Sequence, residues 1–115
     1  MQLYNWDAVP SEALNPHLSR KVIHTQSMTI ARMELRKGGA VAEHHHLNEQ
    51  ISMVEKGALQ FTIEGRQQVV RAGESLVIPP HVPHGVVVLE DSVAVDIFSP
   101  AREDWIRGDD AYLRR

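Results

Sequence analysis

Histidines gather at two places in the chain, and their spacing indicates metal chemistry. Five of the seven histidines lie in segments 43–50 and 79–84. Side chains alternate across a strand, so His44 and His46 project to one face and His45 to the other. Two neutral imidazoles in one space are a start for binding Mn, Fe, Co, Ni, Cu or Zn, but further donors are required. Because the chain has no cysteine, those donors must be nitrogen or oxygen atoms.

Two spaced patterns surround these histidines. The first, G-x5-H-x-H-x3-Q-x6-G, runs from Gly38 to Gly57, and the second, G-x5-P-x4-H, runs from Gly73 to His84. Together they resemble the two sequence motifs of the cupin superfamily, in the same order and at the same separation, over residues 36–88. The resemblance implies one divalent transition metal ion, of unspecified identity, whose ligands are His44, His46, Gln50 and His84.

The chain departs from the usual cupin pattern at three positions. Gln50 stands in place of Glu, His81 in place of Gly, and Val88 in place of a terminal Asn. Glu49 is adjacent, but its side chain falls on the opposite strand face, so Gln50 is the better ligand. An amide oxygen carries no charge, which makes the bound ion a stronger Lewis acid and favours hydration, isomerisation or lyase chemistry over redox cycling. The simpler alternatives are a polar barrel lining for the histidines and an ordinary strand position for Gln50.

A narrower resemblance, to the KdgF-like cupins, is carried by three segments, residues 50–57, 78–85 and 96–104. It extends over about residues 6–106. It implies an enzyme that converts cyclic 4,5-unsaturated monouronates, released from pectin or alginate, into the linear keto form. A sugar acid is therefore the expected small-molecule partner.

The last expected strand offers a residue for proton transfer. An unsaturated uronate is an enol ether, so opening it needs a proton at one alkene carbon and oxygen attack at the other. Alternation places Asp96 on the same face as Ala94 and Phe98. If that face lines the barrel, Asp96 acts as general acid or base and Phe98 as a wall against the sugar. Otherwise Asp96 is a solvated surface residue and Phe98 belongs to the core.

The acid group of such a substrate also needs an anchor. Arg102 is expected to pair with it through its planar guanidinium, and a surface ion pair with Glu103 or Asp104 is the alternative. His81 is expected near the barrel mouth, either as a turn residue or as a substrate contact.

Short alternating segments must position these residues. They predict strands over residues 28–35, 59–63, 67–71, 75–78, 85–89 and 92–98. About eight such strands in one domain predict an all-β jelly roll, the double-stranded β-helix barrel of cupins. Residues 1–115 are expected to form a single domain: an N-terminal arm over 1–20, the barrel over 21–100, and a C-terminal tail over 101–115 whose Trp105 packs on the barrel. The arm would cover an open face or add an edge strand across a dimer interface.

Composition narrows the partners. The net charge is −3, and no basic stripe is present, which argues against nucleic acid. No apolar run approaches the length of about 20 residues that a membrane helix needs. The start lacks the features of a signal peptide, so the expected location is the cytoplasm. The family resemblance implies a homodimer.

Two other functions fit the same ligands. One is another metal-dependent cupin enzyme, a dioxygenase or isomerase. The other is a non-catalytic cupin that binds a small acid or carries the metal. Asp96 and Arg102 discriminate, because a binding module needs no proton-transfer group beside the ion.

Overall fold

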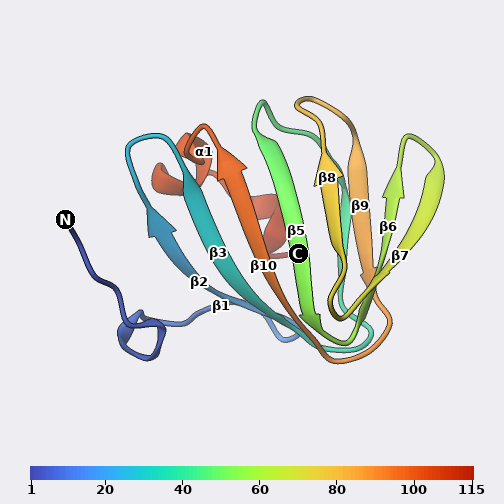
Figure 1. Ribbon diagram of the computed structural model, residues 1–115. Helices are drawn as coiled ribbons and strands as arrows, with labels where there is room; N and C mark the ends of the chain where they lie inside the picture. Colours follow the sequence, from blue (N-terminus) through green and yellow to red (C-terminus); the bar gives the residue numbers. More distant parts are fainter.

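Two antiparallel β-sheets face each other in the computed structural model, which describes residues 1–115 (Figure 1). The strands are β1 (Glu12–Asn15), β2 (Leu18–His24), β3 (Thr29–Leu35), β4 (Ala40–His44), β5 (Glu49–Lys56), β6 (Ala58–Ile63), β7 (Arg66–Arg71), β8 (Ser75–Ile78), β9 (His84–Val88) and β10 (Ser92–Ser99). The larger sheet has the order β1-β2-β3-β10-β5-β8 and the smaller one β4-β9-β6-β7. The predicted all-β jelly roll is confirmed.

The strands form because their apolar residues recur at every second position. In β3 the residues Thr29, Ala31, Met33 and Leu35 are buried, whereas those between them are more exposed. The buried faces of both sheets meet in one core cluster that includes Phe61. Burying a large apolar side chain contributes about 1.5–3 kcal/mol, so this cluster holds the two sheets together.

The N-terminal region contains more strand than the arm expected over residues 1–20. Strands β1 and β2 form a hairpin, and β2 pairs with β3 along its whole length. The sheet edge formed by β1 therefore pairs with a strand of its own chain, and not across a dimer interface as one of the two expectations had it. The sequence of β2 does not show a regular apolar alternation, because Arg20, a charged residue, occupies a buried position and is only 4% exposed. Residues before β1, including the short 3-10 helix η1 (Trp6–Ala8), project away from the barrel (Figure 1).

The C-terminal tail closes one side of the barrel. It contains a single turn of helix α1 (Glu103–Ile106) and a 3-10 turn η2 (Ala111–Leu113). Trp105 and Leu113 join the core cluster, so Trp105 packs on the barrel as predicted. Because η2 packs against β4 and bonds to Asn15 at the other sheet's edge, the tail bridges the two sheets. None of the helical segments is long and apolar enough to span a membrane.

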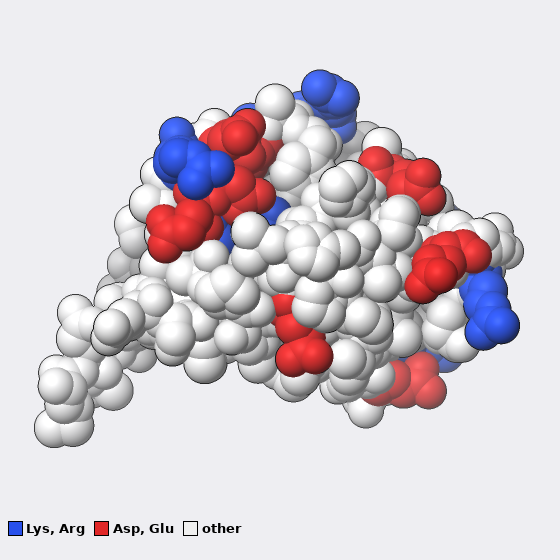
Figure 2. Space-filling view, turned by 90° about the horizontal axis from the view of Figure 1, so that it is seen from above, with Lys and Arg blue, Asp and Glu red and all other residues white.

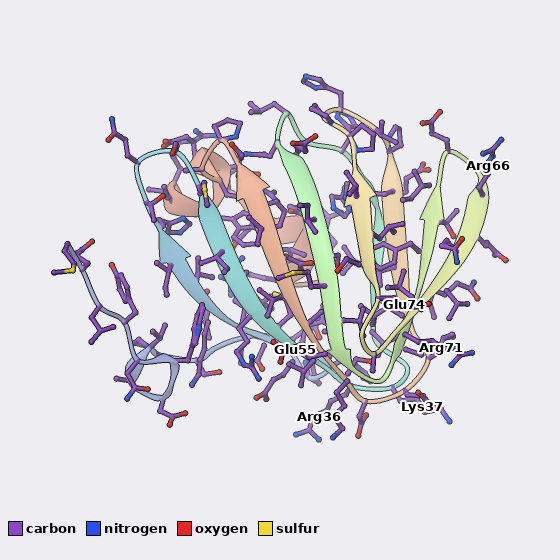
Figure 3. All side chains as sticks on the ribbon, viewed as in Figure 1. Arg36, Lys37, Glu55, Arg66, Arg71 and Glu74 are labelled. Atoms are coloured by element: carbon purple, nitrogen blue, oxygen red, sulfur yellow. The ribbon has the colours of Figure 1, made fainter.

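The two ends of the barrel differ in their side chains. The histidine-bearing loops and the start of α1 lie together at one end, the top in Figure 1. Arg36, Lys37, Arg71 and Glu74 lie at the opposite end (Figure 3). Seen from above the histidine end, acidic and basic residues form small separate groups and no continuous basic patch (Figure 2).

Candidate metal centre

Two histidines of the smaller sheet and a third from a loop meet inside one end of the barrel. His44 ends β4, His46 lies in the following loop, and His84 begins β9. One ligand nitrogen from each ring lies within 4.8 Å of the others. The ring centroids are 4.3 Å apart for His44 and His84, 5.0 Å for His46 and His84, and 5.8 Å for His44 and His46. The predicted histidines therefore share a single space.

Each of the three rings is oriented by a nearby backbone carbonyl. The Nδ1 atoms lie 2.8 Å from the Ala42 oxygen for His44, 3.1 Å from the Asn48 oxygen for His46, and 2.8 Å from the Val82 oxygen for His84. A carbonyl only accepts, so Nδ1 carries the proton and Nε2 presents its lone pair to the shared space.

Burial keeps these imidazoles neutral. It lowers the pKa of His44 and of His46 to about 4, and it also lowers the pKa of His84. Removal from water disfavours the charged imidazolium, and the neighbouring Arg102 cation acts in the same direction. At neutral pH all three rings are therefore in the form that binds a metal.

Two features of the site fit a bound cation. The Nε2 atom of His84 is buried and has no hydrogen-bond partner. The Nε2 atom of His46 lies 3.1 Å from Oε1 of Gln50, the second residue of β5, although both atoms present lone pairs. A cation between them would satisfy all of these acceptors. Three imidazole nitrogens and one amide oxygen suit a divalent transition metal.

Asp96 lies in the same cavity, on the inward face of β10. Its strand neighbours are Ser52 on β5 and Ala31 on β3. Its Oδ1 atom is buried without a hydrogen-bond partner. Burial raises the pKa of Asp96 to about 6, although Ser52, Gln50 and the charge of Arg102 act against this shift. A carboxyl group with such a pKa can both take and give a proton near neutral pH.

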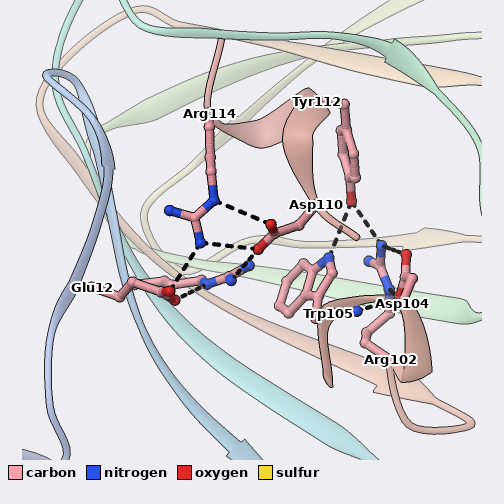
Figure 4. Close-up of polar contacts among 8 residues, drawn as sticks. Glu12, Arg102, Asp104, Trp105, Asp110, Tyr112 and Arg114 are labelled. Atoms are coloured by element: carbon pink, nitrogen blue, oxygen red, sulfur yellow. Dashed lines mark hydrogen bonds and ion pairs between the residues drawn. The ribbon is translucent and has the colours of Figure 1, made fainter. Parts of the chain in front are cut away.

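Arg102 is 1% exposed and is held in place on several sides (Figure 4). Its Nε and Nη2 atoms donate to the two carboxylate oxygens of Asp104, at 3.0 and 2.9 Å. Its guanidinium carbon lies 4.7 Å from the ring centre of Phe98 and 4.4 Å from that of Trp105. The alternative ion pair with Asp104 is therefore present, but its Arg102 side chain is buried and lines the cavity. A contact of Arg102 with a substrate stays a prediction.

Phe98 and His81 occupy different environments. Phe98 is buried, lines the cavity, and meets the His46 ring edge-on with centroids 5.7 Å apart. It thus belongs both to the core and to the cavity wall. The side chain of His81 is exposed and does not line the cavity. Its backbone N–H donates to the His46 carbonyl at 2.7 Å, so His81 fixes the loop that contains His46.

The cavity between these groups measures about 60 Å³. It brings together most of the predicted site: His44, Gln50, His84, Asp96, Phe98 and Arg102. It also contains Ser52 and Tyr112, which were not predicted from the sequence. Ser52 follows Gln50 by two positions on the same strand face, so strand alternation could have predicted that it lines the cavity. Tyr112 lies in the tail, where no periodic pattern marks it.

Comparison with known proteins gives similarities over most of the chain. The cupin domain family matches residues 31–99. The pectin degradation protein KdgF of Dickeya dadantii (strain 3937) is 32% identical over 103 residues, which cover 87% of this chain and 94% of the relative.

Solved structures are similar over the same region. The structure of KdgF from Halomonas sp. superposes with a TM-score of 0.84 at 31% identity, covering 90% of this chain and 99% of the other. An RmlC-like cupin from Shewanella frigidimarina NCIMB 400 gives a TM-score of 0.85 at 29% identity, covering 91% and 96%.

Proposed function

The chain belongs to the cupin family, in which it is KdgF-like, and from that premise we propose that it linearises cyclic 4,5-unsaturated monouronates released from pectin or alginate. One observation carries the proposal: the Asp96 carboxyl group, whose Oδ1 atom is buried, and the buried guanidinium of Arg102 stand in the same cavity as the histidine cluster. A protein that only binds metal would need neither group. The role of the Dickeya relative in pectin degradation supports the same substrate class.

We propose that His44, His46, His84 and Gln50 hold one divalent transition metal ion. When bound there, the ion supplies positive charge that binds oxygen atoms of the substrate and favours negative charge developing on them. The neutral Gln50 leaves more of that charge available than a carboxylate would.

Asp96 is the proton-transfer residue of this proposal. The expected oxygen attack on the alkene is not needed in this reaction: the ring C–O bond at the anomeric carbon breaks, the anomeric hydroxyl loses a proton, and one alkene carbon gains a proton. The product is thus an isomer of the substrate. A carboxyl group whose pKa is about 6 can accept the first proton and deliver the second.

Arg102 and Phe98 form the wall against which the sugar acid would lie. Asp104 holds the guanidinium in one orientation, so little side-chain freedom is lost when an acid group binds to it. The Phe98 ring excludes water from the same wall, which strengthens charge interactions there.

The decisive experiment follows the enol-ether absorbance of freshly made unsaturated monouronate. We expect metal-loaded protein to remove this absorbance faster than the spontaneous reaction, and protein treated with a chelator to lose the effect. No acceleration by the metal-loaded protein would overturn the proposal. Oxygen uptake with catechols or flavonols would instead identify a dioxygenase.

We also propose that the protein forms a homodimer through the outer face of its larger sheet. Paired positions on β2, β3, β10 and β5 carry Ile23, Ile30, Ile97 and Ile51 in one row. The N-terminal arm contacts this same face at Trp6, whose carbonyl accepts a hydrogen bond from the outward-facing Lys21 side chain at 2.8 Å. The arm exposes Leu3, which covers nothing on its own chain. A second copy would supply both an apolar arm and an apolar face.

A further inference from the structure

Tyr112 reaches the metal centre from the C-terminal tail. Its ring lies against that of His44, with centroids 4.6 Å apart and an interplanar angle of 34°. It also lines the cavity that contains Asp96 and Arg102. A tyrosine in this place supplies both an apolar surface and one hydroxyl group.

The hydroxyl group of Tyr112 has its acceptor sites filled. It accepts a hydrogen bond from Nη2 of Arg102 at 2.7 Å and another from Nε1 of Trp105 at 3.3 Å (Figure 4). A phenol has one proton to donate besides its lone pairs. No protein group accepts that proton, so the hydroxyl is available as a donor.

Arg102 has a second free donor beside this hydroxyl. Asp104 occupies the guanidinium edge formed by Nε and Nη2. The remaining N–H of Nη2, which donates to Tyr112, points along the same edge as an N–H of Nη1. Nη1 makes no hydrogen bond within the protein. The Nη1 group and the Tyr112 hydroxyl are therefore neighbouring donors without acceptors.

We propose that Tyr112 is a substrate-binding residue, whose hydroxyl and Nη1 of Arg102 each donate to one oxygen of the substrate carboxylate. This inference rests on the proposed function and deepens it. It replaces the simple two-pronged grip expected of Arg102, because Asp104 already occupies that fork. The acid group of the sugar would thus be bound jointly by two tail residues, Arg102 just before α1 and Tyr112 in η2.

The tail is anchored firmly enough to serve this purpose. The side chain of Asn15 donates to the Leu113 carbonyl at 3.2 Å, and Asp110 is paired with Arg20 and Arg114. These bonds fix η2 on both sides of Tyr112. The hydroxyl is held in position before any ligand arrives, which reduces the entropy lost on binding.

Tyr112→Phe tests the inference, with Tyr4→Phe as the matched control. The phenylalanine keeps the ring beside His44 and removes only the hydroxyl, whereas Tyr4 is exposed on the arm. A hydrogen bond to a charged group predicts a rise in KM of about 10- to 100-fold in Tyr112→Phe. Metal content should equal that of the wild type. Tyr4→Phe should leave KM, kcat and metal content unchanged.

The methyl ester of the substrate separates carboxylate binding from other roles. An ester lacks the negative charge, so we expect the loss of kcat/KM in Tyr112→Phe to shrink to within about twofold for it. Unchanged kinetics on the acid, an equal loss on acid and ester, or loss of the metal would each overturn the inference.

Direct binding keeps this test separate from that of the proposed function. Metal-loaded Asp96→Asn, which we expect to bind substrate without converting it, is titrated with unsaturated monouronate in a calorimeter. Adding Tyr112→Phe should weaken binding by about 10-fold or more. Equal affinities would overturn the role of Tyr112. Absence of turnover in the wild type would overturn only the proposed reaction.

Discussion

His44, His45 and His46 are consecutive, but only His44 and His46 belong to the proposed metal centre, because their side chains point into the shared space and that of His45 does not. His46 is buried within the ligand cluster, whereas the side chain of His45 is exposed. His46→Ala should therefore lower metal affinity by at least about tenfold, while His45→Ala should retain the metal. Elemental analysis after dialysis against a defined metal concentration measures this. Equal metal loss in both variants would contradict the assignment.

Asp96 is expected to act on the substrate and not on the metal. Asp96→Asn keeps the shape of the side chain but removes its ability to take a proton. Turnover of unsaturated monouronate should fall by about 10²- to 10⁴-fold, whereas metal content should stay at the wild-type level. The absorbance assay and elemental analysis of the same preparation give both values. If Asp96→Asn lost its metal as His46→Ala is expected to do, the separation of roles would be wrong.

At the residue scale, the sequence predicted the groups that follow strand alternation and spaced motifs. It brought His44, His46 and His84 together and placed Asp96 on the same strand face as Phe98, but it left open whether that face points inward. It did not predict Tyr112, because the contact between residues 44 and 112 joins distant segments through a tail without periodicity. It also left the burial of Arg102 open, since only the folded chain shows that Phe98 and Trp105 enclose it.

At the element scale, the connection between β5 and β6 depends on Gly57. Its φ is +85°, and a Cβ atom there would clash with Oγ of Ser92 and with the Asp91 carbonyl oxygen. Gly57→Ala should lower the free energy of unfolding by about 2–4 kcal/mol, through backbone strain and overpacking.

Gly73→Ala provides the control for strain alone. Gly73 has a φ of +87°, but a Cβ atom there would meet nothing within 4 Å. We expect a loss of about 1–2 kcal/mol from the left-handed backbone only. Urea denaturation of both variants measures the difference. Equal losses would show that the contact with Ser92 is relieved at little cost.

The C-terminal tail is attached to the hairpin β1–β2 by ion pairs. Burial would raise the pKa of Asp110, but hydrogen bonds from Arg114 and Arg20 outweigh it, and the pKa is lowered. A carboxyl group with a lowered folded-state pKa stabilises the protein above its unfolded pKa, and that stability is lost as the pH falls. Asp110→Asn should lower the free energy of unfolding by about 3 kcal/mol at pH 7, because the buried charge of Arg20 then lacks one of its two carboxylate partners.

The difference between wild type and Asp110→Asn should be constant from neutral pH down to about pH 5 and should narrow below about pH 4. Thermal unfolding at several pH values measures it. Asp109→Asn is the matched control, because Asp109 is exposed and reaches Arg107 only at 4.0 Å. A gap that widened in acid would contradict a lowered pKa for Asp110 in the folded protein.

Elements could be predicted wherever polar and apolar residues alternate, as in β3, β6 and β10. The hairpin β1–β2 was missed as a regular part of the barrel because the buried position of Arg20 breaks the alternation. Its charge is compensated by Glu12 and by Asp110, which lies 90 residues away in the chain. No local pattern reveals such a partner.

At the scale of the whole molecule, the proposed dimer makes a prediction about the outer face of the larger sheet. Ile97 stands in the middle of the isoleucine row. Ile97→Glu should convert the dimer into a monomer, because a charge would be buried between the two copies. Val87→Glu, at an exposed position on the smaller sheet, should leave the dimer intact. Light scattering after size exclusion gives the mass of each variant. A monomeric wild type would contradict the proposed dimer.

Trp105 gives this protein an internal optical signal. Its indole ring has two guanidinium carbons, those of Arg20 and Arg102, each 4.4 Å from the ring centre, and its Nε1 donates to Tyr112. Excitation of indole moves electron density within the ring, so nearby charges determine the wavelength of its fluorescence emission. An anion arriving beside Arg102 would change that field and shift the emission, and a paramagnetic ion held by the histidines would quench it. The other tryptophan, Trp6, lies outside this cluster in the N-terminal segment and supplies a constant background.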